Sequence, residues 1–536
     1  MGNAQLLDCT LRDGAYLIDK KFGDNTIHGI IRGLVQARMD YIEIGFLQDG
    51  GFGEGKTVFR DSADAARFVP ADKGVSEFTV LADYSRFTVE NLDHRREDSI
   101  DAVRECFFKH ERYDAIAACY KIKEKGYKVF VQPVDILGYT DAELLELIAL
   151  VNQLEPYCVS IVDTFGSMYE EDLRHVYSLI DHNLASGIKI GFHSHNNMQL
   201  SNALSQSFLR MAVGKRQVIV DGTISGMGRG AGNTPTELIA QYMVAKLGYS
   251  YDMDALLDII DGYMDNIRAR CTWGYSTPYF IAGCYSAHVN NIAYLTQKNS
   301  IRSRDIRYIL NKIGAQPRKR YDYDLLEQTY LEYLQSDVDD TDVLEALRSA
   351  LSGKAVVVIA PGKTASSYRD KITEYIRNHN AIAITVNFLH DTIPADFVYM
   401  SNVRRYRYWR NAPEFAGIKK IITSNVLPGG DDRTSIVSFA RLVKCGWEHL
   451  DNSTIMLLRL LDLLQVSSIA IAGLDGYGFR SEENYATSYL ELANVKENPA
   501  ALNDEISAML RDYLETRQNS APVTFITPSR FEAVLE

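Results

Sequence analysis

Several features that mark membrane and secreted proteins are missing from this sequence. No stretch reaches the roughly 18 consecutive apolar residues that a membrane-spanning helix needs. The N-terminus, MGNAQLLDCTLRDG, has no basic segment followed by an apolar one, so it lacks the pattern of a signal peptide. We therefore expect a soluble, cytoplasmic protein without a membrane partner.

Paired cysteines and an excess of positive charge are missing too. The seven cysteines are scattered, and no two of them form a C-x-x-C pair. This usage is typical of reduced thiols in a cytosol rather than of a disulfide framework or a zinc knuckle. The formal net charge of -13 argues against nucleic acid or an anionic membrane as a partner, because both attract basic proteins.

What the sequence contains is the composition of an ordinary globular protein, with 46% hydrophobic and 24% charged residues. A chain of 536 residues is too long to fold around a single hydrophobic core, so we expect about two or three domains. Over residues 5–226, eight short apolar runs alternate with helical stretches. The runs are QLLDCTL, YIEIGF, EFTVLA, IDAVREC, KVFVQPVDI, CVSIVDTFG, IKIGFHSH and QVIVDGTISG.

Eight β-then-α units are the number that closes a parallel (β/α)8 barrel, whereas a doubly wound sheet usually stops at about five to seven strands. We therefore predict an α/β fold with a TIM barrel over residues 1–248. Residues 249–351 have a helical pattern rich in tyrosine, and we expect them to cover the barrel mouth or to mediate dimerisation. A second α/β pattern opens at KAVVVIAPGKTASS and predicts a Rossmann-like domain over residues 352–536.

Two histidines end the seventh predicted strand, in GFHSHNN, and a carboxylate follows the first strand, in TLRDG. His193 and His195 are two residues apart, so in a strand they share one face. With Asp13 they supply an oxygen and nitrogen set that suits an octahedral Mn²⁺ or Mg²⁺, or Co²⁺ or Fe²⁺. Zn²⁺ more often recruits a cysteine or a third histidine. Taken alone, the pair also fits two hydrogen-bonded histidines near a strand end.

Five motifs in order resemble the DRE-TIM metallolyase superfamily, the HMG-CoA lyase-like proteins, which includes the isopropylmalate and homocitrate synthase families and the 4-hydroxy-2-oxovalerate aldolase family. The motifs are TLRDG, IEIGF, VDTFG, FHSHNN and GMGRGAGNTPTE. The resemblance implies that Asp13, His193 and His195 bind a divalent metal and that Arg12 is the catalytic arginine. Arg12 would neutralise the oxyanion that forms when a 2-keto acid becomes an enolate.

The same resemblance implies that Glu43 and Asp163 hold the site together. It also matches Asn233, in GAGN, to a metal-ligand asparagine of the lyase and synthase branches. The stretch RDGAYLI lacks the glutamine-bearing sequence of the CoA-dependent branches, so the aldolase family is the nearest. That family has an acid/base histidine where this chain has Tyr16. A phenol has a pKa of about 10, so Tyr16 is a base only if the metal and Arg12 lower its pKa; otherwise it donates a hydrogen bond or lines the pocket.

AGCYSAHVNNIAYL resembles the aldolase region that follows the barrel. The resemblance implies that Tyr285 lies over the substrate. His288, three residues later on the same helix face, is a candidate to replace the missing histidine. The alternative for both side chains is aromatic packing at the barrel mouth.

In the C-terminal region, APGKTASS is not a Walker A loop, because Val357 stands where that motif needs glycine. It is still a strand–turn–helix junction whose amides suit an anion. With ITVNF, ADFVYMSN and SSIAIAGLDGYGF it resembles 6-hydroxymethylpterin diphosphokinase-like and sialyltransferase-like Rossmann domains. The resemblance implies nucleotide or sugar-nucleotide binding, or a scaffold that lost its chemistry. The candidate binding residues are Gly362, Ser366, Asn387, Asn402 and Asp475.

The leading hypothesis is a class II pyruvate aldolase, a metal-dependent carbon–carbon lyase that forms or cleaves a 4-hydroxy-2-keto acid through the pyruvate enolate. One alternative is a Claisen-type acyltransferase that uses acetyl-CoA, and another is a biosynthetic scaffold with a nucleotide-sugar-binding C-terminal domain. We expect a 2-keto acid and an aldehyde as substrates and a homodimer as the assembly. The aldehyde dehydrogenase partner of the aldolase family is not expected, because nothing in the sequence indicates a docking surface for it.

Overall fold

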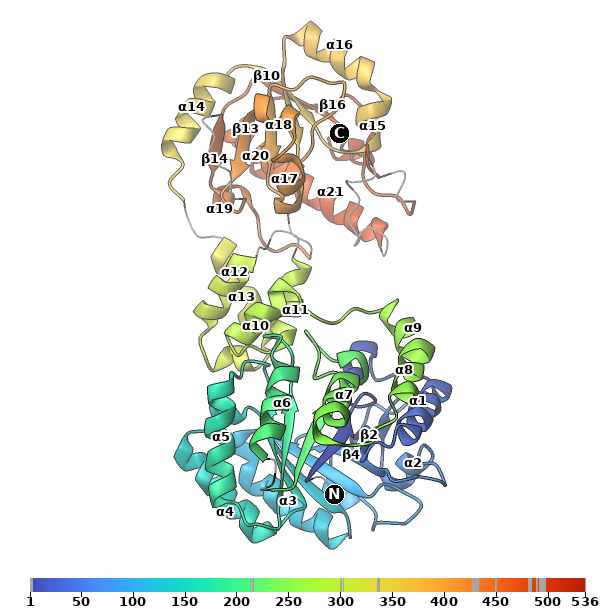
Figure 1. Ribbon diagram of the computed structural model, residues 1–536. Coiled ribbons are helices and arrows are strands. Elements are labelled where there is room, and N and C mark those ends of the chain that lie inside the picture. The colour runs from blue at the N-terminus through green and yellow to red at the C-terminus, as the bar shows by residue number, and fades with distance from the viewer. Residues whose placement is uncertain are drawn as a thin grey trace. The chain divides into compact units, whose positions relative to one another are not determined.

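The chain folds into two compact units, Met1–Ile292 with Gly314–Tyr321, and Ala293–Ile313 with Asp322–Glu536. The computed structural model (Figure 1) describes residues 3–298 apart from 213 and 215, residue 301, and residues 303–334, 338–426, 433–448, 451–480, 484–487, 490 and 498–535. Each unit has its own parallel sheet. No helix among these residues is long and apolar enough to cross a membrane.

The first unit is built on a closed barrel of eight parallel strands. Its strands are β1 (Ala4–Asp8), β2 (Tyr41–Leu47), β4 (Glu77–Asp83), β5 (Ala102–Phe107), β6 (Lys128–Pro133), β7 (Cys158–Asp163), β8 (Lys189–Ser194) and β9 (Val218–Gly222). Each strand pairs with the next, and β1 pairs with both β9 and β2, which closes the sheet. The short β3 (Val58–Phe59) pairs with the end of β2. The predicted TIM barrel is therefore confirmed.

Helices surround the barrel strands (Figure 1) and bury their apolar faces against them. They are α1 (Asp24–Gln36), α2 (Ser62–Ala66), α3 (Arg112–Glu124), α4 (Asp141–Leu154), α5 (Glu170–Asn183), α6 (Ser201–Ala212) and α7 (Thr236–Leu247). Every residue of β2 is buried, as expected for a parallel strand covered on both faces, and this is why the strands appear as near-continuous apolar runs in the sequence.

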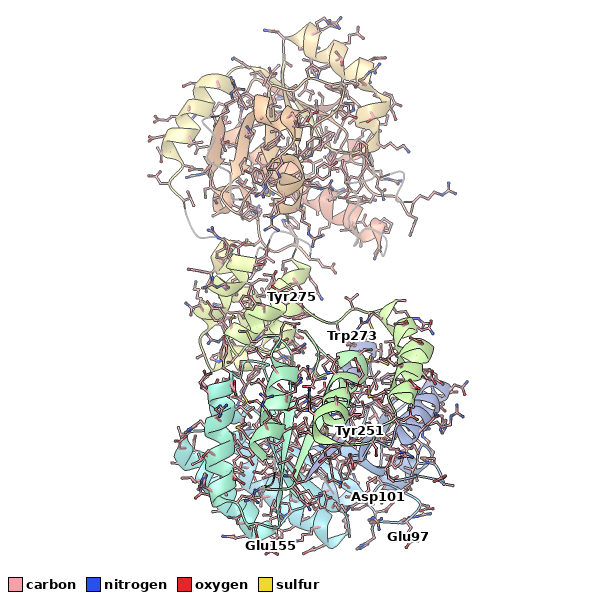
Figure 2. All side chains as sticks on the ribbon, viewed as in Figure 1. Glu97, Asp101, Glu155, Tyr251, Trp273 and Tyr275 are labelled. Carbon is pink, nitrogen blue, oxygen red and sulfur yellow. The ribbon has the colours of Figure 1, made fainter. Side chains whose placement is uncertain are left out.

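The two ends of the barrel differ in what their loops carry. Asp101, just before β5, and Glu155, at the end of α4, lie at the end where the strands begin (Figure 2). Asp101 accepts the Phe78 amide at 3.0 Å and so ties two strands together there. The opposite end, where the strands finish, is where active sites form in barrels of this kind.

The described residues between 253 and 351 are mostly helical, and they are shared between the two units. Their helices are α8 (Met253–Ile259), the π-helical turn η6 (Ile260–Met264), α9 (Asp265–Arg268), α10 (Thr277–Cys284), α11 (Val289–Gln297), α12 (Ser303–Ile313), α13 (Tyr323–Leu334) and α14 (Thr341–Leu351). Helices α8 to α10 belong to the barrel unit and α12 to α14 to the second unit. The division of the chain at residues 248 and 351 stays a prediction.

The second unit contains a seven-stranded parallel sheet. Its strands are β10 (Ala355–Ile359), β11 (Ile382–Val386), β12 (Phe397–Met400), β13 (Lys419–Thr423), β14 (Thr434–Val437), β15 (Ser468–Ala472) and β16 (Val523–Phe525). They follow the order β14-β13-β12-β11-β10-β15-β16. The second α/β pattern is thus confirmed as a parallel sheet, and its Rossmann-like character stays a prediction. The strand order reverses between β10 and β15, and such switch points are where parallel open sheets bind ligands.

Among the described residues after β10, the helices of this unit are α15 (Lys363–Ser367), α16 (Arg369–His379), α17 (Val403–Trp409), α18 (Pro413–Gly417), α19 (Phe439–Leu442), α20 (Ser453–Leu463) and α21 (Pro499–Thr516). Three of them, α17, α20 and α21, begin at asparagines whose side chains accept the first backbone amides. No disulfide joins any of the seven cysteines, all of which lie in the described part of the chain, in keeping with the absence of C-x-x-C pairs.

Candidate active site at the barrel mouth

Asp13, His193 and His195 come together where β1 and β8 end. The Nε2 atom of His193 lies 3.0 Å from Asp13 Oδ2, and that of His195 lies 3.5 Å from the same oxygen. The ligand atoms of the three side chains all lie within 4.8 Å of one another. One carboxylate oxygen and two ring nitrogens therefore face a single point.

The other nitrogen of each imidazole is already engaged. His193 Nδ1 lies 3.0 Å from Asp221 Oδ2, and His195 Nδ1 lies 2.9 Å from the backbone oxygen of Asp163. A carboxylate and a carbonyl only accept hydrogen bonds, so each Nδ1 carries a ring proton. In the neutral rings both Nε2 lone pairs then face the Asp13 carboxylate, and a cation, or a further proton on each ring, is needed to offset the repulsion. Imidazoles oriented in this way through Nδ1 are typical of metal ligands.

Asn233 offers a fourth oxygen beside this group. A backbone bridge pairs Asn233 with His195. Its side-chain Nδ2 donates to the Met227 carbonyl at 3.2 Å, whereas its Oδ1 is buried and has no hydrogen-bond partner among the described residues. A buried acceptor without a partner costs about 1–3 kcal/mol, and a bound cation would satisfy it. The donor set therefore fits a divalent ion with oxygen and nitrogen ligands.

Arg12 is clamped beside the triad. Its Nε donates to Glu43 Oε2 at 2.7 Å and its Nη1 to Asp13 Oδ2 at 3.0 Å. Burial lowers the pKa of Arg12, but the two carboxylates outweigh it and hold the pKa well above its usual value. Burial likewise raises the pKa of Asp13, and Arg12 with the histidines reverses this shift and lowers it well below the ordinary range. Arg12 is thus a fixed cation and Asp13 a fixed anion.

Arg104, which sequence reasoning missed, extends this network through the barrel interior. Its Nη1 lies 3.1 Å from Glu43 Oε2, and its Nη2 donates to Asp221, the carboxylate that holds His193. Arg104 is 1% exposed and Glu43 is fully buried. Positive and negative side chains therefore alternate along this network, which runs from Asp13 through Arg104 on β5 to His193. A single arginine in the apolar run IDAVREC was the only sequence signal.

Asp163 positions the loop that follows β7. Its Oδ1 accepts the backbone amides of Ser167 at 2.9 Å and Met168 at 3.3 Å. Burial raises the pKa of Asp163 to about 6. Its backbone oxygen also holds His195 Nδ1, so Asp163 orients a candidate ligand, and its supporting role in the site stays a prediction.

Tyr16 lies in the 3-10 turn η1 (Gly14–Ile18), directly after the ligand Asp13. Its ring packs edge-on against Phe46, with 5.2 Å between ring centroids, and the Arg229 guanidinium lies 3.9 Å from the Tyr16 ring centroid. Burial raises the pKa of Tyr16 in spite of the nearby arginines. The phenol is therefore protonated and suits hydrogen-bond donation better than proton abstraction.

Tyr285 and His288 lie between α10 and α11. The Tyr285 carbonyl accepts Arg318 Nε at 2.6 Å, and the Arg318 guanidinium is 5.1 Å from the Tyr285 ring. His288 Nδ1 accepts the Asn290 amide at 3.1 Å. Burial, with help from the charges of Arg229 and His195, lowers the pKa of His288 to about 3. A neutral imidazole of such low basicity is a weak general base near pH 7.

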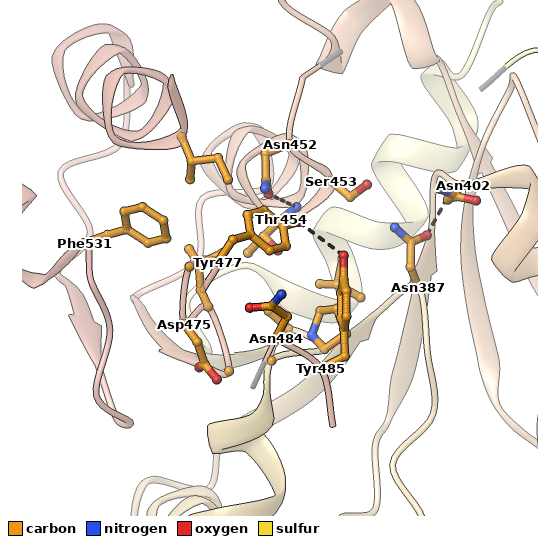
Figure 3. A pocket seen from close by; sticks show the side chains of 18 of the residues that line it. Asn387, Asn402, Asn452, Ser453, Thr454, Asp475, Tyr477, Asn484, Tyr485 and Phe531 are labelled. Carbon is orange, nitrogen blue, oxygen red and sulfur yellow. Dashed lines mark hydrogen bonds between the residues drawn. The ribbon is translucent and has the colours of Figure 1, made fainter. Parts of the chain in front are cut away.

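A separate cavity lies in the second unit, where β10, β11, β12 and β15 end (Figure 3). Four of the five residues predicted to bind a nucleotide line it: Gly362, Asn387, Asn402 and Asp475. The fifth, Ser366, lies outside the lining, with its hydroxyl 3.1 Å from His390 Nε2. The Asp475 carboxylate accepts a hydrogen bond from the Thr364 amide at 2.8 Å. This amide belongs to the APGKTASS turn, whose amides were expected to bind an anion, so a carboxylate of the protein itself takes that place.

The comparisons with known proteins concern the barrel half. Residues 3–261 match the model of the HMGL-like family. A 4-hydroxy-2-oxovalerate aldolase of Thermomicrobium roseum is 26% identical over 320 residues, which cover 56% of this chain and 85% of the aldolase. An oxaloacetate decarboxylase of Mycobacterium tuberculosis is 25% identical over 270 residues, covering 47% of this chain and 74% of the decarboxylase.

Among solved structures, the N-terminal domain of a provisionally named aldolase from Bacteroides vulgatus is 22% identical, with a TM-score of 0.49, and the match covers 55% of this chain and 96% of that domain. By sequence, then, the residues that carry the candidate metal site match the model of the HMGL-like family, and the proteins similar to this region include some named as aldolases.

Proposed function

We propose that the barrel unit is a divalent-metal-dependent aldolase that forms or cleaves a 4-hydroxy-2-keto acid through the pyruvate enolate. The observation that carries the proposal is the convergence of two imidazole Nε2 atoms and one carboxylate oxygen, with both Nδ1 protons held from behind. The names of the relatives support it, because aldol cleavage of 4-hydroxy-2-oxovalerate and decarboxylation of oxaloacetate both leave pyruvate.

Cleavage breaks the C3–C4 bond of the keto acid. The C4 hydroxyl loses its proton and becomes the aldehyde carbonyl, and the bonding electrons pass to C3 and give the enolate, which takes up a proton to become pyruvate. An ion held by Asp13, His193 and His195, with Asn233 as a further ligand, would supply Lewis-acid polarisation of the keto acid oxygens, and Mn²⁺ or Mg²⁺ suits this donor set best.

Side chains of the protein stabilise the enolate and assist proton transfer. Arg12 uses Nε and Nη1 on Glu43 and Asp13, and its Nη2 hydrogens are left to stabilise the enolate oxyanion. The protonated Tyr16 donates a hydrogen bond to the C4 oxygen and keeps its proton, because its raised pKa disfavours a phenolate. A water molecule gives the proton to the C4 alkoxide in synthesis and accepts the C4 hydroxyl proton in cleavage.

The test is pyruvate release from 4-hydroxy-2-keto acids before and after treatment with EDTA. We expect activity to be lost on chelation and restored by Mn²⁺ or Mg²⁺. His193→Ala is expected to lose both the bound metal, measured by elemental analysis, and the activity. His182→Ala, on the exposed face of α5, is the matched control and keeps both. Undiminished turnover after the metal is stripped would refute the mechanism.

The Claisen-type acyltransferase is separated from the aldolase by one assay. It predicts that free thiol appears when acetyl-CoA is mixed with the enzyme and a 2-keto acid, whereas the aldolase predicts none. RDGAYLI supports the aldolase, because it lacks the glutamine-bearing stretch of the CoA-dependent branches.

For the second unit we propose that the cavity of Figure 3 binds a nucleotide or a sugar nucleotide. The cavity lies at the switch point of the sheet, and the Oδ1 atoms of Asn387, Asn402 and Asn452 each accept backbone amides. Their Nδ2 groups are therefore the donors left to face a ligand rich in acceptor oxygens.

Asn387→Asp keeps a side-chain oxygen that can accept the backbone amides of Ser401 and Asn402. It replaces the Nδ2 donor by a negatively charged oxygen. We expect it to weaken the binding of nucleotides and nucleotide sugars to the full-length protein by about tenfold or more in calorimetry. Asn498→Asp, at the start of α21, is the control. A wild-type protein that binds none of these compounds at millimolar concentration would favour the scaffold hypothesis for this unit.

A further inference from the structure

Three basic side chains gather around Tyr16 at the barrel mouth, and neither the motifs nor the metal triad accounts for them. Arg229 lies in the loop after β9, Lys20 follows η1 after β1, and Arg86 follows β4. The strands β9, β1, β2 and β4 are neighbours in the barrel, so the three residues line one continuous side of the mouth. We call them the cationic rim.

The geometry places the cationic rim against the candidate site. The Arg229 guanidinium lies 3.9 Å from the Tyr16 ring centroid, and the Lys20 ammonium lies 5.9 Å from the same centroid. Arg86 interacts electrostatically with Tyr16 and hydrogen bonds to Tyr321. Tyr16 itself follows Asp13 by three residues, in a 3-10 turn, and the charges of Asp13 and Arg229 both act on its phenol. The cationic rim and the candidate metal ligands are therefore both near the same ring.

The charge of the cationic rim is only partly neutralised. Within the described part of the chain, Arg229 pairs with no carboxylate, and Lys20 donates to the neutral amide of Gln48 at 2.8 Å. Arg86 pairs with Asp83 at 3.4 Å, with its side chain 48% exposed. Burial lowers the pKa of Lys20, and the charges of Arg86 and Arg229 lower it further. The three cations therefore repel one another, in a protein whose net charge is -13.

A solvated surface does not explain this arrangement. Arg229 is half-buried and stacked on a ring inside the mouth, where water screens its charge less than at an exposed position. Cations held together in a partly desolvated pocket lower their energy when an anion binds among them. The keto acid end of the substrate is already accounted for by Arg12 and the metal triad, so the anion belongs to the other end.

We propose that the substrate carries a second anionic group, a carboxylate or a phosphate, on the aldehyde-derived half, and that Arg229, Lys20 and Arg86 bind it. This inference rests on the proposed aldolase function, which fixes the position of the keto acid half. It adds the chemical class of the partner aldehyde, an aldehyde with a terminal anion, and it assigns Arg229 as the residue that selects it.

The test uses the metal-loaded, full-length enzyme in aldol synthesis from pyruvate. Butanal is compared with succinic semialdehyde, and glyceraldehyde with glyceraldehyde 3-phosphate, so that each pair differs by the anionic group. We expect kcat/KM to be higher for the anionic aldehyde by about 10- to 100-fold, the effect of a hydrogen bond to a charged group. The pair with the larger ratio identifies carboxylate or phosphate as the preferred group.

Arg229→Gln is expected to reduce that ratio to about one, and Arg96→Gln, which removes an exposed arginine paired with Asp98, is expected to leave it unchanged. If Arg229→Gln does not fold, the ionic strength dependence of the wild type replaces it. Salt is then expected to raise KM for the anionic aldehyde and not for the neutral one.

Equal kcat/KM values within both pairs, or ratios that salt does not change, would overturn the inference and leave the metal-dependent aldolase intact. Failure of the proposed function gives a different result, because no aldehyde is then a substrate and the chelation assay shows no metal-dependent release of pyruvate.

Discussion

At the scale of single residues, the barrel holds its candidate metal ligands with a buried network of alternating charges. Arg12, Glu43, Arg104 and Asp221 link Asp13 to His193 without a break. Burying any one of these charges alone is costly, and the arrangement is stable because each has a partner of opposite sign. The network is therefore sensitive to the loss of a single member.

Arg104→Met tests this sensitivity. It leaves Glu43 and Asp221 buried without their shared cation, so we expect a loss of about 3–5 kcal/mol in the free energy of unfolding. Thermal and urea unfolding of the full-length protein measure it. Arg96→Met, at an exposed pair with Asp98, is the matched control and is expected to change nothing measurable. Equal stability of the two variants would contradict the role of the network.

The low pKa of His288 predicts how the stability of the folded protein changes with pH. Its folded pKa is about 3, below the unfolded value of about 6.5, so the unfolded chain binds the proton first. Stability from this group is present above pH 6.5 and falls as the pH drops from about 6.5 toward 3, by at most about 1.4 kcal/mol per pH unit.

His288→Asn retains an acceptor for the Asn290 amide and removes the titrating ring. Its melting temperature is expected to fall less than that of the wild type between pH 7 and pH 4. His182→Asn, at an exposed position, is expected to behave as the wild type does. Parallel melting curves for His288→Asn and the wild type would show that the imidazole is not held neutral by the fold.

The residues that the sequence indicated and those that it did not differ in a physical way. Asp13, His193 and His195 stood out because their spacing is unusual at a strand end. Arg104 stands next to Glu105 in IDAVREC, and two successive charges do not indicate which of them points into the barrel. The structure shows that Arg104 is 1% exposed. Arg229 lay within a glycine-rich motif, where its contact with Tyr16 depends on barrel closure and has no local signal.

At the scale of elements, α10 lies close against the loops that carry the site. A Cβ atom added at Gly283 would lie 2.9 Å from the Met198 side chain and 3.1 Å from the Gly166 carbonyl. Both neighbours belong to loops after β7 and β8, the strands that carry Asp163 and the histidines. Only glycine lets the helix approach this closely.

Gly283→Ala is expected to displace α10 and to lower kcat/KM for pyruvate release several-fold, while metal binding persists. Gly262→Ala is the control, because a Cβ at this helical position meets nothing within 4 Å and alanine stabilises a helix by about 0.5–1 kcal/mol relative to glycine. Steady-state kinetics and metal content of the two variants measure the difference. Unchanged kinetics in Gly283→Ala would show that the position of α10 is irrelevant to catalysis.

The elements themselves were largely predictable, and the missed strands are short: the two-residue β3 and two strands of the second sheet. All eight barrel strands are buried, so their apolar runs stand out in the sequence. β14 and β16 were missed: they are three or four residues long, lie at the two edges of the second sheet, and are half exposed. An edge strand packs on one side only, and so its sequence carries a weaker pattern.

At the scale of the whole molecule, the candidate metal site and the cavity of Figure 3 belong to different compact units. A ligand that binds only the folded form of one unit raises the stability of that unit by mass action, by about 2.7 kcal/mol at a concentration of 100 times its Kd. The two sites are therefore separable in one thermal scan.

We expect calorimetry of the full-length protein to show two transitions, with Mn²⁺ raising the temperature of one of them. His193→Ala is expected to abolish that shift and His182→Ala to keep it. A single transition that moves as a whole with Mn²⁺ would show that the two units unfold as one cooperative body.

Barrel closure by β1 also sets when the candidate metal site forms. Asp13 and His193 are separated by 180 positions in the chain, and β1 is fixed by pairing with β9 as well as β2. At about 5–20 residues per second, a ribosome needs about 10 to 40 s to progress from one ligand to the other. The growing polypeptide lacks the full candidate ligand set during that interval, so an ion at this site would be bound by the completed barrel and not by the emerging N-terminus.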